Sequence, residues 1–172
     1  MAAFRAIDLK EILPSDNIYF YRNKLEFSFS EKAWIMDKNS ASLKDVPSVA
    51  LGFHVPQRWD KVLDVHECFL QSEVSNSILN AVRNFAILNN IPAYSQETQS
   101  GYFRNLVIRE GKNTGDVMVN VVTFEDRPEI MSTLSSELTK RFPEITTVVN
   151  NVNLRKSQVA VGDFEKVYYG EG

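Results

Sequence analysis

Two basic side chains, Arg22 and Lys24, are the first candidates for chemistry in this 172-residue chain. They stand two residues apart in the segment 21–29, where apolar and polar residues alternate. This alternation predicts a half-buried strand with Tyr21 and Leu25 on its inner side and both cations on its outer side. Such a pair can hold two phosphates, or one phosphate and the edge of a base. The alternative is an ordinary solvated sheet face, in which the cations pair with acidic neighbours.

A second basic pair, Arg104 and Arg109, occurs in the β-rich segment 103–110. Residues five apart on a regular strand fall on opposite faces of a sheet. The two arginines can therefore share a patch only if the strand bulges or if one of them lies at its end. Without such an irregularity they are two separate surface charges.

The remaining reactive residue types are one cysteine, Cys68, and two histidines, His54 and His66. This inventory excludes an intramolecular disulfide and a metal site with four nitrogen or sulfur ligands. A lone cysteine after a strand is usually a small buried apolar residue. As a nucleophile, Cys68 has only His66, two residues away, as a candidate base. His54 is more often a structural or surface residue than a ligand.

The chain contains no motif of a self-contained active site. No glycine-rich phosphate loop, zinc-protease motif or nucleophile elbow is present. The net charge of −3 is spread evenly, which argues against an autonomous nucleic-acid binder. The charged N-terminus does not read as a signal peptide, and no apolar run approaches the roughly 20 residues of a membrane span. With one thiol, we expect a cytoplasmic protein that has no membrane contact.

The elements that must position these residues follow from hydrophobic period and turn residues. Strands are predicted at 21–29, 33–37, 48–55, 61–65, 103–110, 116–124, 145–154 and 167–169. One helix is predicted to begin at Ser75 or Asn76 and to end at 89–90, and a second to carry Pro128 in its first turn and to stop before Pro143. Hairpins outnumber crossovers, which predicts an α+β fold: an antiparallel or mixed sheet with two helices on one face.

Five segments, taken together, resemble one protein family. They are YRNKLEFSF at 21–29, LGFH at 51–54, VLDVHEC at 62–68, GYFRNLVIREG at 101–111 and TGDVMV at 114–119. In this order and spacing they are similar to the central domain of the RNA uracil-5-methyltransferases, in particular those that act on 23S ribosomal RNA. The resemblance covers nearly the whole chain.

The resemblance implies a domain organisation and a set of cofactors. Family members combine an N-terminal RNA-binding barrel in many cases, a central domain and a C-terminal domain that binds S-adenosylmethionine and carries the catalytic cysteine and carboxylate. We therefore expect residues 1–172 to form a single central domain, without the barrel and without the S-adenosylmethionine domain. It would be inactive alone, would position ribosomal RNA for methylation at uridine C5, and would work with those missing domains.

The resemblance also assigns roles to individual residues. Cys68 stands where the family has the fourth ligand of a 4Fe–4S cluster, whose other three ligands this chain lacks, so no cluster is expected on it alone. Arg22 matches a basic position that faces the substrate RNA. Lys24, His54 and the pair Arg104 and Arg109 lie in matching motifs, and for them RNA contact is expected. Balanced charge predicts that RNA binding by this piece is weak and salt-sensitive.

Two other hypotheses stay open from the residues alone. The chain could be a stand-alone module whose sheet binds RNA or a protein strand without catalysis. It could also be a small enzyme that uses Cys68 and His66. The reactivity of the thiol separates the enzyme from the other two, since a catalytic thiolate reacts quickly and a packed thiol slowly.

Overall fold

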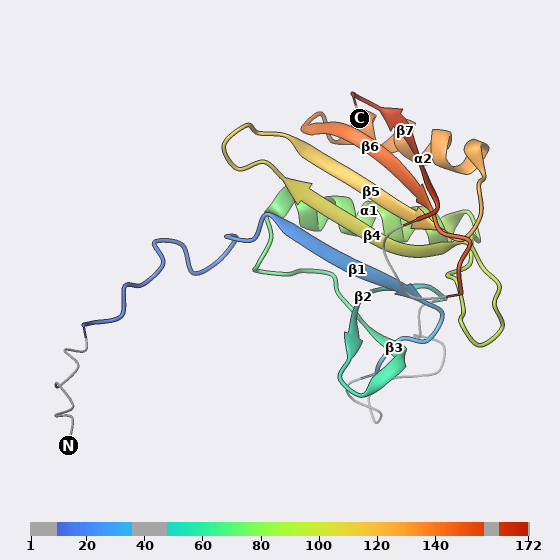
Figure 1. The fold of residues 1–172 in the computed structure, drawn as a ribbon, viewed down its shortest axis with the longest axis horizontal. Coiled ribbons are helices and arrows are strands. Elements are labelled where there is room, and N and C mark those ends of the chain that lie inside the picture. Colours follow the sequence, from blue (N-terminus) through green and yellow to red (C-terminus); the bar gives the residue numbers. More distant parts are fainter. Residues whose placement is uncertain (1–9, 36–47, 157–161, 172) are drawn as a thin grey trace, which may run out of the picture.

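The computed structural model describes residues 10–35, 48–156 and 162–171. In that part of the chain, seven strands and two helices follow the order shown in Figure 1: β1 (Lys24–Ser30), β2 (Ala50–Val55), β3 (Arg58–Asp64), α1 (Glu73–Leu88), β4 (Phe103–Glu110), β5 (Val117–Thr123), α2 (Pro128–Arg141), β6 (Ile145–Val152) and β7 (Phe164–Tyr169). The predicted helices and strands are confirmed with shifted ends, apart from the strand predicted at 33–37.

That segment and the start of β1 differ from the prediction. Ala33 forms one isolated bridge with Val62, and residues 36 and 37 lie outside the described part of the chain. β1 begins only at Lys24, and the ring of Tyr21, predicted to face inward, is 51 % exposed. The reason is a contact between distant segments: the N–H groups of residues 20 and 22 donate to the carbonyls of residues 69 and 70 rather than to a neighbouring strand.

All seven strands form one sheet in the order β3-β2-β1-β4-β5-β6-β7. The neighbours are antiparallel except β5 and β6, which run parallel. A parallel pair needs a crossover connection, and α2 supplies it because it lies between these two strands in the chain. The predicted mixed sheet is therefore confirmed.

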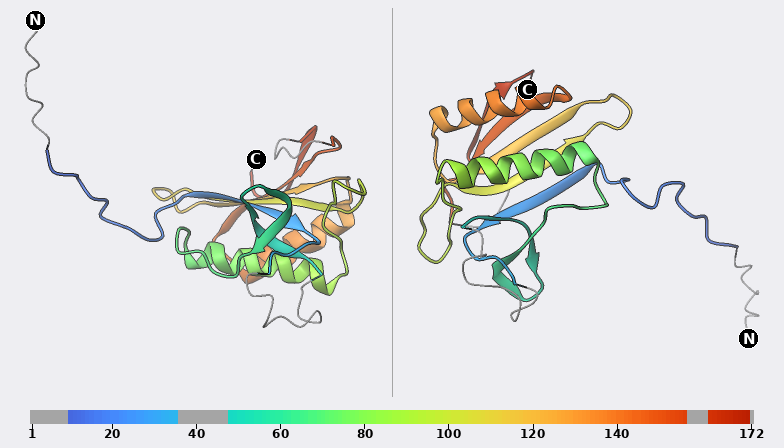
Figure 2. Two further views of the ribbon diagram at one scale, coloured as in Figure 1. Left: turned by 90° about the horizontal axis from the view of Figure 1, so that it is seen from below. Right: turned by 180° about the vertical axis from the view of Figure 1, so that it is seen from behind.

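Both helices cover the same face of the sheet, as Figure 2 shows from behind. The core lies between them and the strands, where one cluster of buried side chains joins both helices to the inward residues of the sheet, among them Phe27, Leu51, Ile78, Val82, Leu106, Ile108, Val119 and Leu134. The opposite, helix-free face carries the alternate residues of each strand. The predicted α+β architecture with two helices on one face is confirmed.

The N-cap of helix α1 is Ser72, three residues before the earliest cap predicted for it. The Ser72 hydroxyl accepts the N–H of Ser75 at 3.1 Å, and Ser75 itself is buried in the first turn. A serine at this position satisfies one of the N–H groups that a helix leaves unpaired at its start. The helix ends at Leu88 with Asn89 as its C-cap, which agrees with the stop predicted at 89–90 before Pro92.

The N-terminal part of the structure is an extended arm. Residues 10–23 contain no helix or strand, and the arm leaves the body at the start of β1 (Figure 1). Within the described residues, neither helix is long and apolar enough to cross a membrane.

Candidate nucleic-acid interface

Lys24 and Arg109 form a cross-strand pair on the helix-free face. They are register partners in the antiparallel ladder of β1 and β4, and both are exposed. Their neighbours Leu25 and Ile108, also register partners, are buried in the core cluster on the other side. Directly opposed residues have their Cβ atoms about 5 Å apart. The structure therefore joins a cation from each of the two sequence-predicted pairs into one site.

Arg22 lies beside this pair but outside the strand. Its side chain is exposed, and its N–H donates to the Leu70 carbonyl at 2.9 Å. It borders a narrow crevice, too small for a water molecule, together with Lys24 and Glu110. Arg22 and Lys24 therefore lie at one corner of the sheet, although they do not belong to one regular strand face as predicted.

Glu110 is the partly buried polar group that holds this corner together. Its carboxylate accepts hydrogen bonds from the hydroxyls of Ser72 and Ser75, at the start of α1, and from Lys112 at 2.5 Å. Its N–H donates to the Asn23 carbonyl at 2.8 Å, which ties β4 to the residue before β1. Burial alone would raise the pKa of Glu110, but the hydrogen bonds from Lys112 and the two serines outweigh it and lower the pKa.

Arg104, at the other end of β4, has a different environment. Its side chain is only 5 % exposed, and Nη1 donates to the carbonyls of Asn153 at 2.9 Å and Arg155 at 2.6 Å. Its guanidinium lies 4.4 Å from the centre of the Tyr94 ring. Burial lowers the pKa of Arg104, against the opposing effect of Tyr94. The residue holds the chain after β6 against the sheet.

A β-bulge in β4 explains why the spacing of Arg104 and Arg109 does not place them on opposite faces of the sheet. The β4–β5 register shifts between Phe103 and Asn105, and both Phe103 and Leu106 pack in the core. The extra residue breaks the strict alternation of faces in β4. The irregularity that a shared arginine face would require is therefore present, but Arg104 is covered there.

His54 is exposed in β2 and lies near Arg104 rather than near Lys24. With Ser28, Asn105 and Arg104 it lines a recess of about 20 Å³. Such a volume holds little more than one water molecule. Lys24 and Ser28 are four residues apart on β1, about 13 Å at the rise of an extended strand. The predicted RNA-binding residues thus fall into two groups at opposite ends of β1 and β4.

Cys68 is packed in the core. Its side chain is 9 % exposed and belongs to the core cluster. The Asn76 side chain brackets its backbone, since Oδ1 accepts the Cys68 N–H at 2.9 Å and Nδ2 donates to the Cys68 carbonyl at 3.2 Å. The described residues contain no group of three His, Cys, Asp or Glu side chains able to hold a metal ion. Since a 4Fe–4S cluster requires four ligands, this buried single thiol does not fit it, and we assign no reaction step to such a cluster.

His66 contacts Asp64 and the buried Arg83. Its Nε2 lies 3.0 Å from Asp64, whose other oxygen is 2.8 Å from Nε of the buried Arg83. Arg83 also donates to the carbonyls of Leu51 and Val65 and so joins α1 to β2 and β3. This geometry gives a structural role to His66 and does not favour a cysteine–histidine enzyme.

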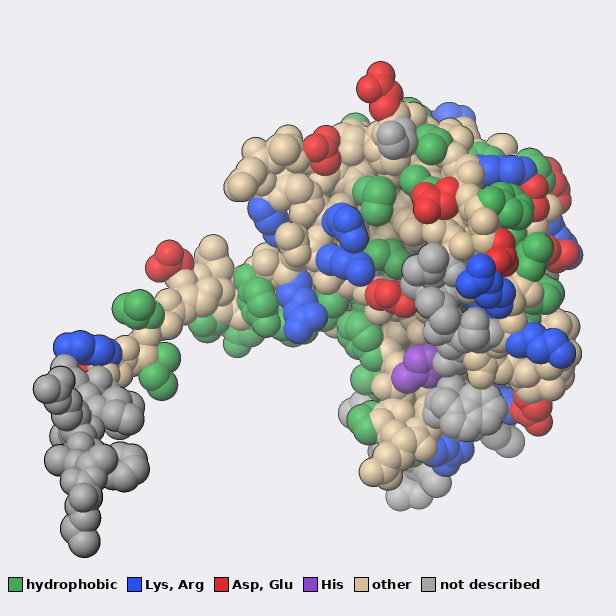
Figure 3. All heavy atoms as spheres, viewed as in Figure 1, with side chains coloured by type: hydrophobic (Ala, Val, Ile, Leu, Met, Phe, Trp, Pro, Cys, Tyr) green, Lys and Arg blue, Asp and Glu red, His purple; other side chains and the backbone are tan. Residues whose placement is uncertain are grey.

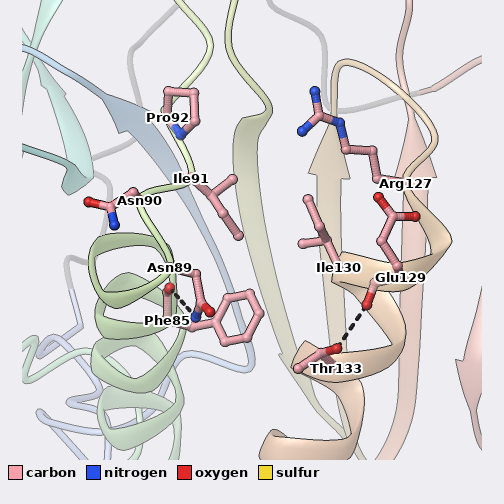
Figure 4. Close-up of a pocket in the computed structure, with 9 residues that line it drawn as sticks. All are labelled: Phe85, Asn89, Asn90, Ile91, Pro92, Arg127, Glu129, Ile130 and Thr133. Carbon is pink, nitrogen blue, oxygen red and sulfur yellow. Dashed lines mark hydrogen bonds between the residues drawn. The ribbon is translucent and has the colours of Figure 1, made fainter.

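A groove of about 410 Å³ lies on the helix side, between the end of α1 and the start of α2. Figure 4 shows its apolar centre, formed by Phe85, Ile91 and Ile130. The Asn89 amide donates to Phe85 O, and the Thr133 hydroxyl to Glu129 O, within their own helices. These two side chains are thus engaged within their own helices. The groove lies on the opposite side of the sheet from Lys24 and Arg109, which together with Arg22 we call the basic corner.

Sequence reasoning missed three exposed aromatic rings beside the basic corner. Tyr19, Phe20 and Phe69, which we call the aromatic corner, form mutual ring contacts with centroids 6.1–6.5 Å apart. An unbroken apolar run, IYFY at 18–21, was a signal available in the sequence. Its pairing with Phe69 could not be predicted, because it depends on a contact between segments about fifty residues apart.

Figure 3, which views the helix-free face, shows how these features combine. Lys and Arg side chains gather over the start of β1 and the end of β4, next to hydrophobic side chains where the arm meets the body. An exposed acid, Glu26, lies between the two ends of β1 and keeps the face from being uniformly basic. The arrangement can hold a few phosphates and contact apolar groups beside them.

No protein-family model matches the chain, but several curated relatives do. An RNA methyltransferase of Chlorobaculum tepidum, described as uncharacterized, is 36 % identical over 100 % of this chain and 36 % of its own length. One of Bacteroides thetaiotaomicron is 40 % identical over 86 % of this chain and 34 % of its own length. A tRNA (uracil(54)-C(5))-methyltransferase of Pyrococcus horikoshii is 28 % identical over 92 % of this chain and 33 % of its own length.

A solved structure agrees with these relatives. The tRNA (uracil-54, C5)-methyltransferase of Pyrococcus abyssi, in complex with S-adenosyl-L-homocysteine, matches 94 % of this chain and 33 % of its own, with a TM-score of 0.63 and 26 % identity. The chain thus spans about one third of the length of the proteins that it matches. The resemblance to RNA methyltransferases of the uracil-5 type, read from the five sequence segments, is confirmed.

Proposed function

From the premise that the chain is related over its whole length to one third of the RNA uracil-5-methyltransferases, we propose that it is the part of such an enzyme that positions the RNA. The basic corner, formed by Arg22, Lys24 and Arg109, holds phosphates of the RNA backbone. The whole protein transfers a methyl group to uridine C5, and S-adenosylmethionine supplies that group.

The cross-strand pair of Lys24 and Arg109 is the observation that carries this proposal. Two exposed cations on directly opposed strand positions present a positive site, because the backbone ladder places the two side chains next to each other. Phosphate contacts of this kind give affinity and orientation without reading the base sequence. The Glu110 network, which ties β4, the start of α1 and the residue before β1, keeps the site rigid.

The other candidate residues have lesser roles in this proposal. His54 is exposed and can add a contact at the far end of β1. Arg104 stabilises the fold, because its Nη1 donates to backbone carbonyls of the segment that follows β6. Cys68 is a core residue, so the methylation nucleophile is expected outside this segment.

Two classes of RNA remain candidates for the substrate. The sequence resemblance favours 23S ribosomal RNA. Two matching proteins whose names state a substrate, those of Pyrococcus horikoshii and Pyrococcus abyssi, both name uracil-54 of tRNA. Methyl transfer from labelled S-adenosylmethionine by the full-length gene product, offered each RNA separately, distinguishes the two.

Binding of the chain to RNA tests the positioning role directly. Fluorescence anisotropy with a labelled RNA hairpin at low salt should detect binding that weakens as salt is added. In the double variant Lys24→Ala/Arg109→Ala, affinity should fall about tenfold and the slope of log K against log salt should decrease by about 2. The matched control is Lys140→Ala, which removes an exposed cation in α2, on the helix side.

The control variant should bind as the parent chain does. Equal losses in the control and the double variant would mean that any cation serves, and the basic corner would lose its assigned role. Arg22→Ala in the full-length protein should in addition lower methyl transfer at limiting RNA. Unchanged RNA binding in all of these variants would favour the alternative of a protein-binding module.

A further inference from the structure

The aromatic corner is unusual for a protein surface. Its three rings are 58 %, 41 % and 54 % exposed for Tyr19, Phe20 and Phe69. They meet each other at interplanar angles of 56–64°, edge to face or tilted, with none stacked on another. This geometry leaves ring faces open to an incoming planar group. Contiguous exposed apolar surface of this kind marks interaction sites.

The backbone holds these rings in place. The Phe20 N–H donates to the Phe69 carbonyl at 2.7 Å, and two residues later the Arg22 N–H donates to Leu70. The loop that carries Phe69 is itself fixed by the Asn76 side chain through Cys68. Phe20 has a φ of 55°, in the left-handed region that a bulky residue avoids. An exposed aromatic residue kept in a strained conformation points to a functional constraint.

The neighbours of the aromatic corner indicate the chemistry of its occupant. Phe20 and Arg22 are two residues apart, so their Cα atoms lie within about 7 Å of each other. Lys24 and Arg109 follow at the start of β1 and the end of β4. Aromatic rings next to cations that can bind a phosphate backbone are the combination that binds unpaired nucleotides, through base stacking and charge.

We propose that the aromatic corner stacks unpaired bases of the RNA whose backbone the basic corner holds. This inference rests on the proposed function and specifies it further: the ligand is a loop or a single strand, because paired bases have no free face to offer. The rings supply the preference for unpaired RNA, and the cations supply affinity for any RNA.

Comparison of two RNA probes tests the inference. One probe is a labelled hairpin with a large unpaired loop, and the other is a fully paired duplex of equal length. Phe69→Ala should lower affinity for the loop probe about tenfold, with little effect on the duplex. Phe69→Tyr should restore the parent affinity, since the ring is kept. The matched control is Leu88→Ala, which truncates an exposed apolar side chain at the end of α1 and should change neither affinity.

Tyr19→Ala is the second variant, and it should show the same selective loss if Phe69→Ala does not fold. Equal effects of the ring variants on both probes, or no effect, would overturn the stacking role. If Lys24→Ala/Arg109→Ala still lowers the affinity for both probes in that case, the proposed function holds and only the stacking inference fails. If that variant also has no effect, both proposals fail. Self-association that Phe69→Ala abolishes, with RNA affinity unchanged, would identify the aromatic corner as a protein contact and overturn the inference.

Discussion

Arg104 and Arg109 lie at the two ends of β4 and have different environments. Arg109 is exposed opposite Lys24 and is available to a ligand. Arg104 is buried, and its donors are directed to two backbone carbonyls beyond β6. The same type of side chain is thus exposed to solvent at one end of the strand and supports the fold at the other. Residue type alone does not separate these roles, because the covering segment decides between them.

The largest effect on stability is expected at the buried end. Arg104→Ala removes two charged hydrogen bonds and leaves the Asn153 and Arg155 carbonyls without that donor. We expect a loss of about 3 kcal/mol in the free energy of unfolding. Urea denaturation measures this value. A loss below about 0.5 kcal/mol, the size of an ordinary surface substitution, would show that Arg104 does not support the fold.

A smaller effect is expected from the carboxylate that holds the exposed end. Glu110→Gln weakens the hydrogen bonds from Ser72, Ser75 and Lys112, and it should cost about 1–2 kcal/mol of stability. Because the folded pKa of Glu110 is below the ordinary 4.5, its contribution is complete above pH 4.5. It is lost as the pH falls through the folded pKa.

Denaturation curves measured at several pH values check this prediction. The difference in stability between the parent and Glu110→Gln should be largest near neutral pH and should shrink in acid. A difference that grows as the pH falls would contradict the lowered pKa and the role of the carboxylate as an acceptor.

Cys68 extends the comparison to the loop that carries the aromatic corner. Cys68→Ala should cost about 1 kcal/mol of stability, since the thiol packs in the core. In the parent chain, a thiol reagent should react slowly under native conditions and quickly in urea. Rapid reaction of the native chain would contradict the packing of the Cys68 thiol in the core and would favour the hypothesis that Cys68 is a nucleophile.

The smallest change in stability is expected at the exposed end. Arg109→Ala should alter the free energy of unfolding by less than about 0.5 kcal/mol, because its side chain is exposed. The affinity of this variant for RNA should fall about threefold, and the slope of log K against log salt should decrease by about 1. Arg104→Ala at a temperature where it stays folded is the matched comparison, and it should leave the salt slope unchanged. The opposite ranking of the two variants would reverse the roles assigned here.

Much of the fold could be predicted from local patterns. The alternation at 24–30 reports which side chains face the core, and Pro128 and Pro143 bound the second helix in both prediction and structure. The sequence predicts Ser75 or Asn76 as the cap of the first helix, whereas the cap is Ser72, because several polar residues in this stretch can serve as caps. The early start predicted for β1 was wrong, because residues 20 and 22 bond to a loop that local pattern cannot place.

In the candidate site, too, some features follow from the sequence and others only from the tertiary structure. The sequence by itself determined the α+β class, the helix-free face of β1 and the resemblance to RNA methyltransferases, because these depend on residue order and period. Tertiary structure alone decided that Lys24 meets Arg109, that Arg104 is covered and that Phe69 joins Tyr19 and Phe20. Each of these depends on strand register, on a bulge or on a contact between distant segments, where the free energy comes from partners that no local pattern identifies.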